Sequence, residues 1–215
     1  AVTAPDGPAL VLAGAGSGKT RVIIERMAHL VEDRGVNPRN LLAVTFTNKA
    51  AGEMRNRFSR RIALDVIPSF IGTFHSFGLW ILRRNADLLE RPKDFTIFDD
   101  QDQLSLMKRL VKELPKTFMT VLPREALSYI SRIKQIEPYP NWSDPPDTPE
   151  DETCLELCHR YQNTLKGYGA LDFDDLTALT SFLLERFPDV CEKYRQRFRH
   201  ILVDEYQDTN RSQYV

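Results

Sequence analysis

A glycine-rich stretch near the start of this 215-residue chain restricts its fold more than any other feature. Three glycines lead directly into lysine and threonine, and the stretch reads Ala13, Gly14, Ala15, Gly16, Ser17, Gly18, Lys19, Thr20. The apolar run 9–13 before it predicts a buried strand, and residues 21–27 begin a helical pattern. A strand, a glycine turn, Lys-Thr and a helix together form a phosphate-binding loop.

The residue types in this loop suit a nucleotide and a magnesium ion. Glycines let successive backbone N–H groups point at one anion, and the start of the following helix adds its positive dipole end. Lys19 can reach the terminal phosphates, and the hydroxyl of Thr20 can ligate Mg²⁺. Position 13 is alanine, whereas the general pattern G-x-x-x-x-G-K-[ST] begins with glycine. Gly14 and Gly16 keep the turn flexible.

Two adjacent acids follow another apolar run close to the end of the chain. Residues 200–203 predict a buried strand, and Asp204 and Glu205 come directly after it. In a chain with a phosphate loop, the aspartate can hold Mg²⁺ and the glutamate can orient and deprotonate an attacking water. The combination predicts a nucleotide hydrolase.

Further strands alternate with helical patterns, which defines the fold class. Residues 41–45 form a continuous apolar run, and residues 70–73 predict a short strand. We therefore expect an α/β fold of the P-loop NTPase type, with a parallel sheet and helices on both faces.

Ligands bind at the carboxyl ends of such strands, where this chain places several polar and aromatic residues. Thr47 or Asn48 can cap the next helix. Phe46 is either a core residue or a platform on which a base stacks. His75 alone is either a structural histidine or a ligand contact.

The segment 85–167 has a different pattern. Apolar residues recur at helical spacing over 104–111, 127–133 and 155–165, and the acidic, proline-rich stretch 137–149 predicts a surface loop. We read 85–167 as an all-helical subdomain inserted into an α/β domain formed by 1–84 and 168–215.

Composition excludes several classes of protein. The formal net charge is −1, so any nucleic-acid site must be local. No apolar run approaches a membrane span of about 20 residues, and no signal-peptide pattern opens the chain. Three cysteines favour a reducing compartment, the cytoplasm. Cys154, Cys158 and His159 would lie on neighbouring helical turns, but a structural zinc site needs a second ligand pair, so buried free thiols are expected.

Five motifs occur in one order along the chain. They are Ala13–Arg21, Thr45–Ala51, Gly72–Phe77, Asp172–Leu176 and Val203–Thr209. Together they resemble the N-terminal portion of superfamily 1 DNA helicases of the UvrD, PcrA and Rep type. The resemblance spans almost the whole chain, and alanine at position 13 is the usual form of the loop in that family.

The resemblance implies a role for each motif. Lys19 and Thr20 would hold phosphate and Mg²⁺, and Arg21 would lie near the base and ribose of ATP. Asp204 would hold Mg²⁺, Glu205 would be the catalytic base, and Gln207 would sense the γ-phosphate. The single-stranded DNA path would be lined by Phe46, Thr47, Asn48, His75 and Phe173. The implied activity is ATP-driven 3′-to-5′ unwinding at junctions of duplex and single-stranded DNA.

The family pattern also contains parts that this sequence lacks. Members have a glutamine-bearing motif before the phosphate loop and a second RecA-like domain whose arginines complete the ATP site. Loss of such an arginine costs about 10³–10⁵ in rate. We therefore expect a portion that keeps its fold and weak nucleotide and DNA affinity, with almost no unwinding.

Two other functions stay open. A P-loop kinase or another NTPase would share the loop, although residues 48–51 lack the aspartate of a guanine-reading Asn-Lys-x-Asp motif. A single-strand-binding module could also use the nucleotide only as a switch.

Overall fold

The computed structural model describes residues 1–14, 16–62, 68, 70–136 and 148–214. These residues belong to two compact units. The first unit consists of Ala1–Phe77 and Pro188–Thr209, and the second of Gly78–Phe187 and Asn210–Val215.

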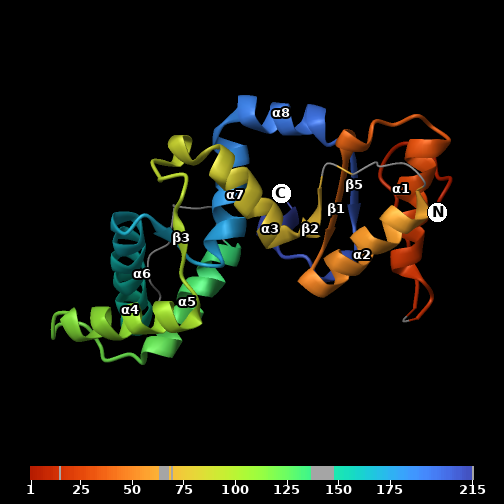
Figure 1. The fold of residues 1–215 in the computed structure, drawn as a ribbon. Helices are drawn as coiled ribbons and strands as arrows, with labels where there is room; N and C mark the ends of the chain where they lie inside the picture. Colours follow the sequence, from red (N-terminus) through yellow and green to blue (C-terminus); the bar gives the residue numbers. More distant parts are fainter. Residues whose placement is uncertain (15, 63–67, 69, 137–147, 215) are drawn as a thin grey trace. The chain divides into compact units, whose positions relative to one another are not determined.

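The first unit is built on a three-stranded parallel sheet (Figure 1). Strand β1 (Leu41–Thr45) lies between β2 (Phe70–Thr73) and β5 (His200–Val203). Ala43 is in register with Ile71 of β2 and with Leu202 of β5. All three strands were predicted from the sequence, and their parallel order confirms the α/β class.

Helices cover both faces of this sheet. Helices α1 (Lys19–Glu32) and α2 (Asn48–Arg61) share a buried cluster with Ala43 and Ile71. Phe70 is one residue from Ile71 along β2, so its side chain points to the opposite face. There it contacts Phe77 at 5.2 Å between ring centroids, and Phe77 contacts Phe198 at 5.4 Å, just beyond α8 (Pro188–Arg197).

The sequence interpretation was wrong about the segment before the phosphate loop. Residues 9–13 form no strand, and the side chains of Leu10 and Leu12 are 69% and 87% exposed. Strand β5 was expected to be buried, yet Ile201 is 61% exposed, because β5 is hydrogen-bonded to β1 alone in the described sheet. Hydrophobicity predicts that a strand favours burial, but not which neighbouring strand will pair with it.

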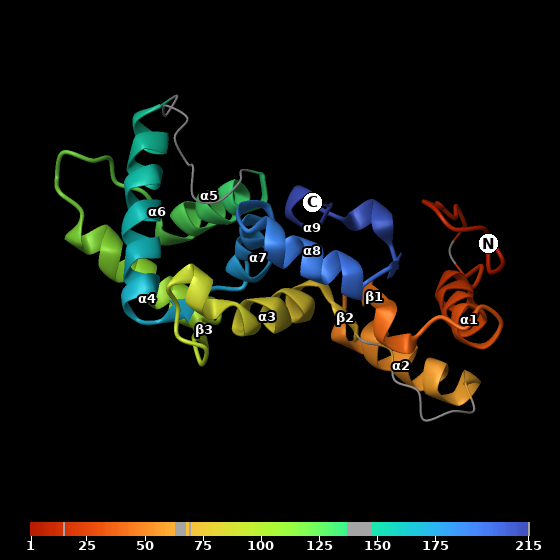
Figure 2. The same cartoon turned by 90° about the horizontal axis from the view of Figure 1, so that it is seen from above.

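The second unit is mainly helical (Figure 2). Helices α4 (Asp100–Glu113), α5 (Pro123–Ile136) and α6 (Pro149–Gly167) pack on one another. The other described helices are α3 (Phe74–Arg84), α7 (Asp175–Arg186), α9 (Arg211–Tyr214), and the short 3₁₀ turns Pro38–Asn40, Ala86–Leu89 and Tyr206–Asp208.

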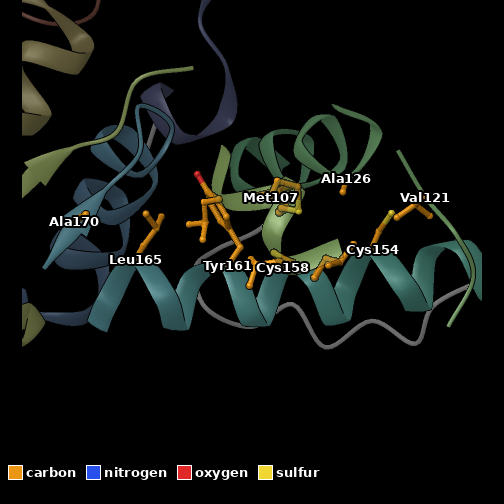
Figure 3. Packing of buried hydrophobic residues seen from close by; sticks show 12 residues of the cluster. Met107, Val121, Ala126, Cys154, Cys158, Tyr161, Leu165 and Ala170 are labelled. Atoms are coloured by element: carbon orange, nitrogen blue, oxygen red, sulfur yellow. The ribbon is translucent and has the colours of Figure 1, made fainter. Parts of the chain in front are cut away.

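The core of this second unit is an apolar cluster between the helices (Figure 3). Met107 of α4, Cys158 and Tyr161 of α6 are completely buried in it. Cys154 and Cys158 are free thiols, and burial raises their pKa values to about 11 and about 12. The two side chains therefore behave as small apolar residues, as the sequence predicts.

The 85–167 segment is not entirely helical. Thr96–Ile97 forms β3, which pairs in parallel with β4 (Ala170–Leu171). Strands of two residues are too short to leave a periodic signal in the sequence. The predicted surface loop 137–149 lies mostly outside the described residues, and Thr148 caps α6 by accepting a hydrogen bond from the backbone N–H of Asp151.

Among the described helices, none is both long enough and apolar enough to cross a membrane.

Candidate functional site

The glycine-rich loop of the first unit turns sharply before α1. Gly16 and Gly18 have φ angles of 74° and 89°, in the left-handed region that favours glycine. Ser17 closes the turn, because its Oγ donates to the carbonyl oxygen of Gly14 at 2.6 Å. Helix α1 begins at Lys19, so its first N–H groups lie next to this turn. Ala13 lies just before the turn, and Ala15 is outside the described residues.

Two contacts join the loop to the acids after β5. The Nζ of Lys19 lies 2.9 Å from Oε2 of Glu205. The hydroxyl of Thr20 donates to Oδ2 of Asp204 at 3.3 Å. Residues more than 180 positions apart in sequence therefore meet at one point, as the motif pairing predicts. The backbone of β5 fixes the second contact, since the N–H of Asp204 still donates to Val44 of β1.

The charges at this point are set by these contacts. Hydrogen bonds from Gln207 and then from Lys19 lower the pKa of Glu205, so its carboxylate is ionised near neutral pH. The hydrogen bond to Glu205 raises the pKa of Lys19. Burial raises the pKa of Asp204. Glu205 also has φ 52°, a strained conformation for a residue with a side chain, and strain of this kind gathers at functional sites.

A hollow of about 420 Å³ opens beside the loop. Arg21 lines it together with Val2, Gly16 and Glu25. Apart from Val2, the lining residues therefore come from both the loop and the first two turns of α1.

The oxygen atoms at Thr20 and Asp204 suit a magnesium ion. Mg²⁺ is held by one or two protein oxygens together with phosphate oxygens and water. Thr20 and Asp204 supply one hydroxyl and one carboxylate within 3.3 Å of each other. The described residues contain no group of three or more His, Cys, Asp or Glu side chains that could form an all-protein metal site. Such a sparse set fits Mg²⁺ bound with phosphate.

The end of β1 presents the second set of predicted residues. Thr47 is the cap of α2, since its Oγ1 accepts from the backbone N–H of Ala50 at 3.1 Å. Asn48 is exposed at the first position of that helix. The ring of Phe46 lies 5.4 Å from that of Phe74, with an interplanar angle of 56°. Phe46 is half-buried, and Asn48 two residues later is exposed.

His75 lies in a turn held by reciprocal hydrogen bonds. The backbone N–H of Thr73 donates to Oγ of Ser76 at 2.8 Å, and the N–H of Ser76 donates to Oγ1 of Thr73 at 3.1 Å. Gly72 is required beneath this turn, because a Cβ there would lie 2.6 Å from Oγ of Ser76. The turn fixes where His75, which is half-buried, leaves the end of β2.

Phe173 lies in a similar turn of the second unit, where it has the place that Phe74, the neighbour of His75, has in the first. The N–H of Asp172 donates to Oδ2 of Asp175, and the N–H of Asp175 donates to Oδ1 of Asp172. Between these buried acids, the side chain of Phe173 is 52% exposed. Lys134 of α5 forms ion pairs with both of these carboxylates.

Sequence reasoning missed three residues that support these positions. Phe74 packs on Phe46, Arg55 donates to the carbonyl oxygen of Ile71 at 2.7 Å, and Lys134 binds the acids beside Phe173. Thr73 and Ser76 are three residues apart, as are Asp172 and Asp175, and this spacing of polar residues was a signal for the reciprocal turns. Nothing in the sequence pointed to Lys134, which is 38 residues from Asp172.

A known protein family matches the whole chain and agrees with this geometry. The model of the UvrD/REP helicase N-terminal domain matches residues 1–215. The chain belongs to this family. It is 44% identical to a protein of Leuconostoc citreum named ATP-dependent DNA helicase PcrA, and 43% and 41% identical to proteins of that name from Bacillus subtilis and Staphylococcus aureus. Each alignment covers all of this chain, which spans about 30% of the length of these relatives.

Proposed function

We propose that this chain is the ATP-binding and single-stranded-DNA-binding portion of an ATP-dependent 3′-to-5′ DNA helicase. The observation that carries the proposal is the meeting of Lys19 and Thr20 with Glu205 and Asp204. A phosphate loop and a strand-end acid pair at hydrogen-bonding distance make up the two halves of a nucleotide hydrolase site. The named relatives are ATP-dependent DNA helicases, which supports ATP as the nucleotide and DNA as the polymer.

Each residue of the site has one task in this proposal. The loop from Ala13 to Gly18 holds the phosphates with its backbone, and Lys19 neutralises them. Thr20 and Asp204 would hold Mg²⁺, which would neutralise negative charge on the phosphates when bound. Glu205 takes the proton of the attacking water, Gln207 lies beside it to respond to the γ-phosphate, and Arg21 lines the hollow for base and ribose.

Single-stranded DNA binds at the ends of the strands. Stacking on aromatic rings tolerates every base and contributes about 1–3 kcal/mol per base, which suits a motor that does not read sequence. Phe46 and Phe173 offer the rings, and Thr47, Asn48 and His75 offer polar contacts. In this assignment residues 1–84 and 168–215 form a RecA-like domain, and 85–167 form an accessory helical subdomain. A second RecA-like domain and a duplex junction are the partners.

Binding of each ligand tests the proposal on the 215-residue chain. Fluorescence anisotropy of labelled oligothymidylate is measured at low salt, with and without a non-hydrolysable ATP analogue and Mg²⁺. Nucleotide affinity is measured in parallel by titration of a fluorescent ATP analogue with Mg²⁺. We expect Lys19→Met to lose nucleotide affinity and to keep DNA affinity, and Phe46→Ala with His75→Ala to lose DNA affinity and to keep nucleotide affinity. Lys93→Met, which removes an exposed lysine paired with Asp87, serves as the control for both.

Each contrary result favours a specific alternative. Nucleotide binding without any DNA binding at low salt would favour a P-loop kinase or another NTPase. DNA binding that responds to nucleotide, in a full-length enzyme whose hydrolysis DNA does not stimulate, would favour a nucleotide-switched binding module.

A further inference from the structure

The second unit contains a buried ion cluster of Lys134, Asp172 and Asp175. The two acids of this cluster also close the turn that carries Phe173. The side chain of Lys134 has no exposed surface, and Asp172 and Asp175 are 3% and 0% exposed. The Nζ of Lys134 lies 2.8 Å from Oδ1 of Asp175 and 2.5 Å from Oδ2 of Asp172. Burial alone would lower the pKa of Lys134, but Asp175 and Asp172 raise it, so the lysine stays charged.

The four carboxylate oxygens divide their bonds between the turn and the lysine. Oδ1 of Asp172 and Oδ2 of Asp175 accept the two backbone N–H groups that close the turn. The other two oxygens accept from Lys134, and Gln162 adds a bond to Oδ1 of Asp175 at 3.3 Å. Lys134 therefore holds both acids by the oxygens that the turn does not use.

The turn beneath His75 provides a comparison within the same chain. Thr73 and Ser76 exchange the same pair of backbone bonds with neutral side chains. Two buried carboxylates in that arrangement repel each other, and an unpaired buried charge is strongly destabilising. The acidic version of the turn therefore depends on a cation, which the neutral version does not need.

We propose that Lys134 is a positioning residue for single-stranded DNA binding, which acts by holding the Asp172–Asp175 turn so that Phe173 presents its ring to a base. Lys134 is buried and does not touch DNA in this role. The inference rests on the proposed stacking role of Phe173.

The test compares DNA with bases and DNA without them. Affinities of the 215-residue chain are measured for oligothymidylate and for an abasic oligonucleotide of equal length. We expect Phe173→Ala and Lys134→Met each to weaken binding of oligothymidylate by roughly 5- to 100-fold, the loss of one base stack, with little change for the abasic strand. Lys166→Met removes an exposed lysine paired with Glu90 in the same unit and should change neither affinity.

A double variant separates positioning from a general structural effect. Lys134→Met should add little to the loss in a Phe173→Ala background, because both changes remove the same stack. An additive loss, an equal loss on the abasic strand, or no loss at all would overturn the inference. If Phe173→Ala itself has no effect, the stacking role fails first and the inference fails with it.

Stability is checked by circular dichroism. Leu157→Ala, which opens the fully buried core of the unit, shows what destabilisation alone does to base-dependent affinity. If Lys134→Met does not fold, Asp172→Asn replaces it. That variant keeps an oxygen for the N–H of Asp175, but its amide no longer attracts Lys134. Base-dependent affinity equal to wild type in folded Asp172→Asn would overturn the inference.

Discussion

At the scale of single residues, Glu205 has a strained backbone, an ionised side chain and an ion pair with Lys19. Glu205 is the residue that we assign as the catalytic base, and it has both a left-handed backbone conformation and a lowered pKa. The same carboxylate binds Lys19, the residue that we assign to the phosphates. A phosphate must therefore compete with Glu205 for Lys19, and the two assignments are coupled.

This competition predicts that Glu205→Gln binds nucleotide more tightly than the wild type. The amide cannot form an ion pair with Lys19, so the lysine is freely available to the phosphates. Exposed ion pairs are weak, and we expect a gain of about two- to fivefold in affinity for an ATP analogue with Mg²⁺. Titration of a fluorescent analogue measures it.

Glu53→Gln is the matched control, because Glu53 forms an exposed ion pair with Arg57 on α2. It should leave nucleotide affinity unchanged. Weaker binding by Glu205→Gln would contradict the competition and would indicate that Glu205 supports the nucleotide directly.

At the scale of elements, the sequence predicts those whose signal is local. The strands β1, β2 and β5 and the helices α4, α5 and α6 follow from runs and periodicities of their own residues. Residues 9–13 have the composition of a strand, but forming one depends on a partner elsewhere in the chain. The ion pair between Lys134 and Asp172 was also beyond prediction, because packing of α5 on the start of α7 creates it. Long-range pairing is set by tertiary structure, which no local pattern encodes.

The crossing of α3 and α7 gives a prediction at this scale. An added Cβ at Gly78 of α3 would lie 2.1 Å from the carbonyl oxygen of Leu176 and 3.0 Å from Oγ1 of Thr180. Backbone atoms cannot move aside cheaply, so we expect Gly78→Ala to lower the free energy of unfolding by about 2–3 kcal/mol. Urea unfolding followed by circular dichroism measures the loss.

Gly52→Ala is the opposite case within α2. Outside the adjoining backbone of α2, no described atom lies within 4 Å of a Cβ added there, and alanine is more favourable than glycine in a helix interior by about 0.5–1 kcal/mol. We expect this variant to be slightly more stable than the wild type. Equal behaviour of the two alanine variants would mean that α3 and α7 do not approach closely at Gly78.

At the scale of the whole molecule, each unit has its own core, and among the described residues the buried thiols belong to the second unit. The sequence correctly placed Cys154 and Cys158 on one buried helical face. It could not give their pKa values, because these depend on how completely α4 and α5 cover α6. Burial raises those values to about 11 and about 12, against an ordinary value of 9.0.

These thiols predict a loss of stability at alkaline pH. Between pH 8 and pH 10 the unfolded chain releases most of both thiol protons while the folded chain keeps nearly all of them, so the unfolded state binds fewer protons and the free energy of unfolding falls as pH rises. From pH 8 to pH 10 we expect a loss of about 1 kcal/mol per thiol. Urea unfolding at the two pH values measures the loss, and the double variant Cys154→Ser with Cys158→Ser is the comparison.

Serine does not titrate in this range, so the double variant should lose less stability over the same interval, even if it is less stable at pH 8. Other alkaline groups, such as Lys134, are present in both proteins and cancel in the comparison. An equal loss in both proteins would mean that the two thiols ionise as easily in the folded chain as in the unfolded one.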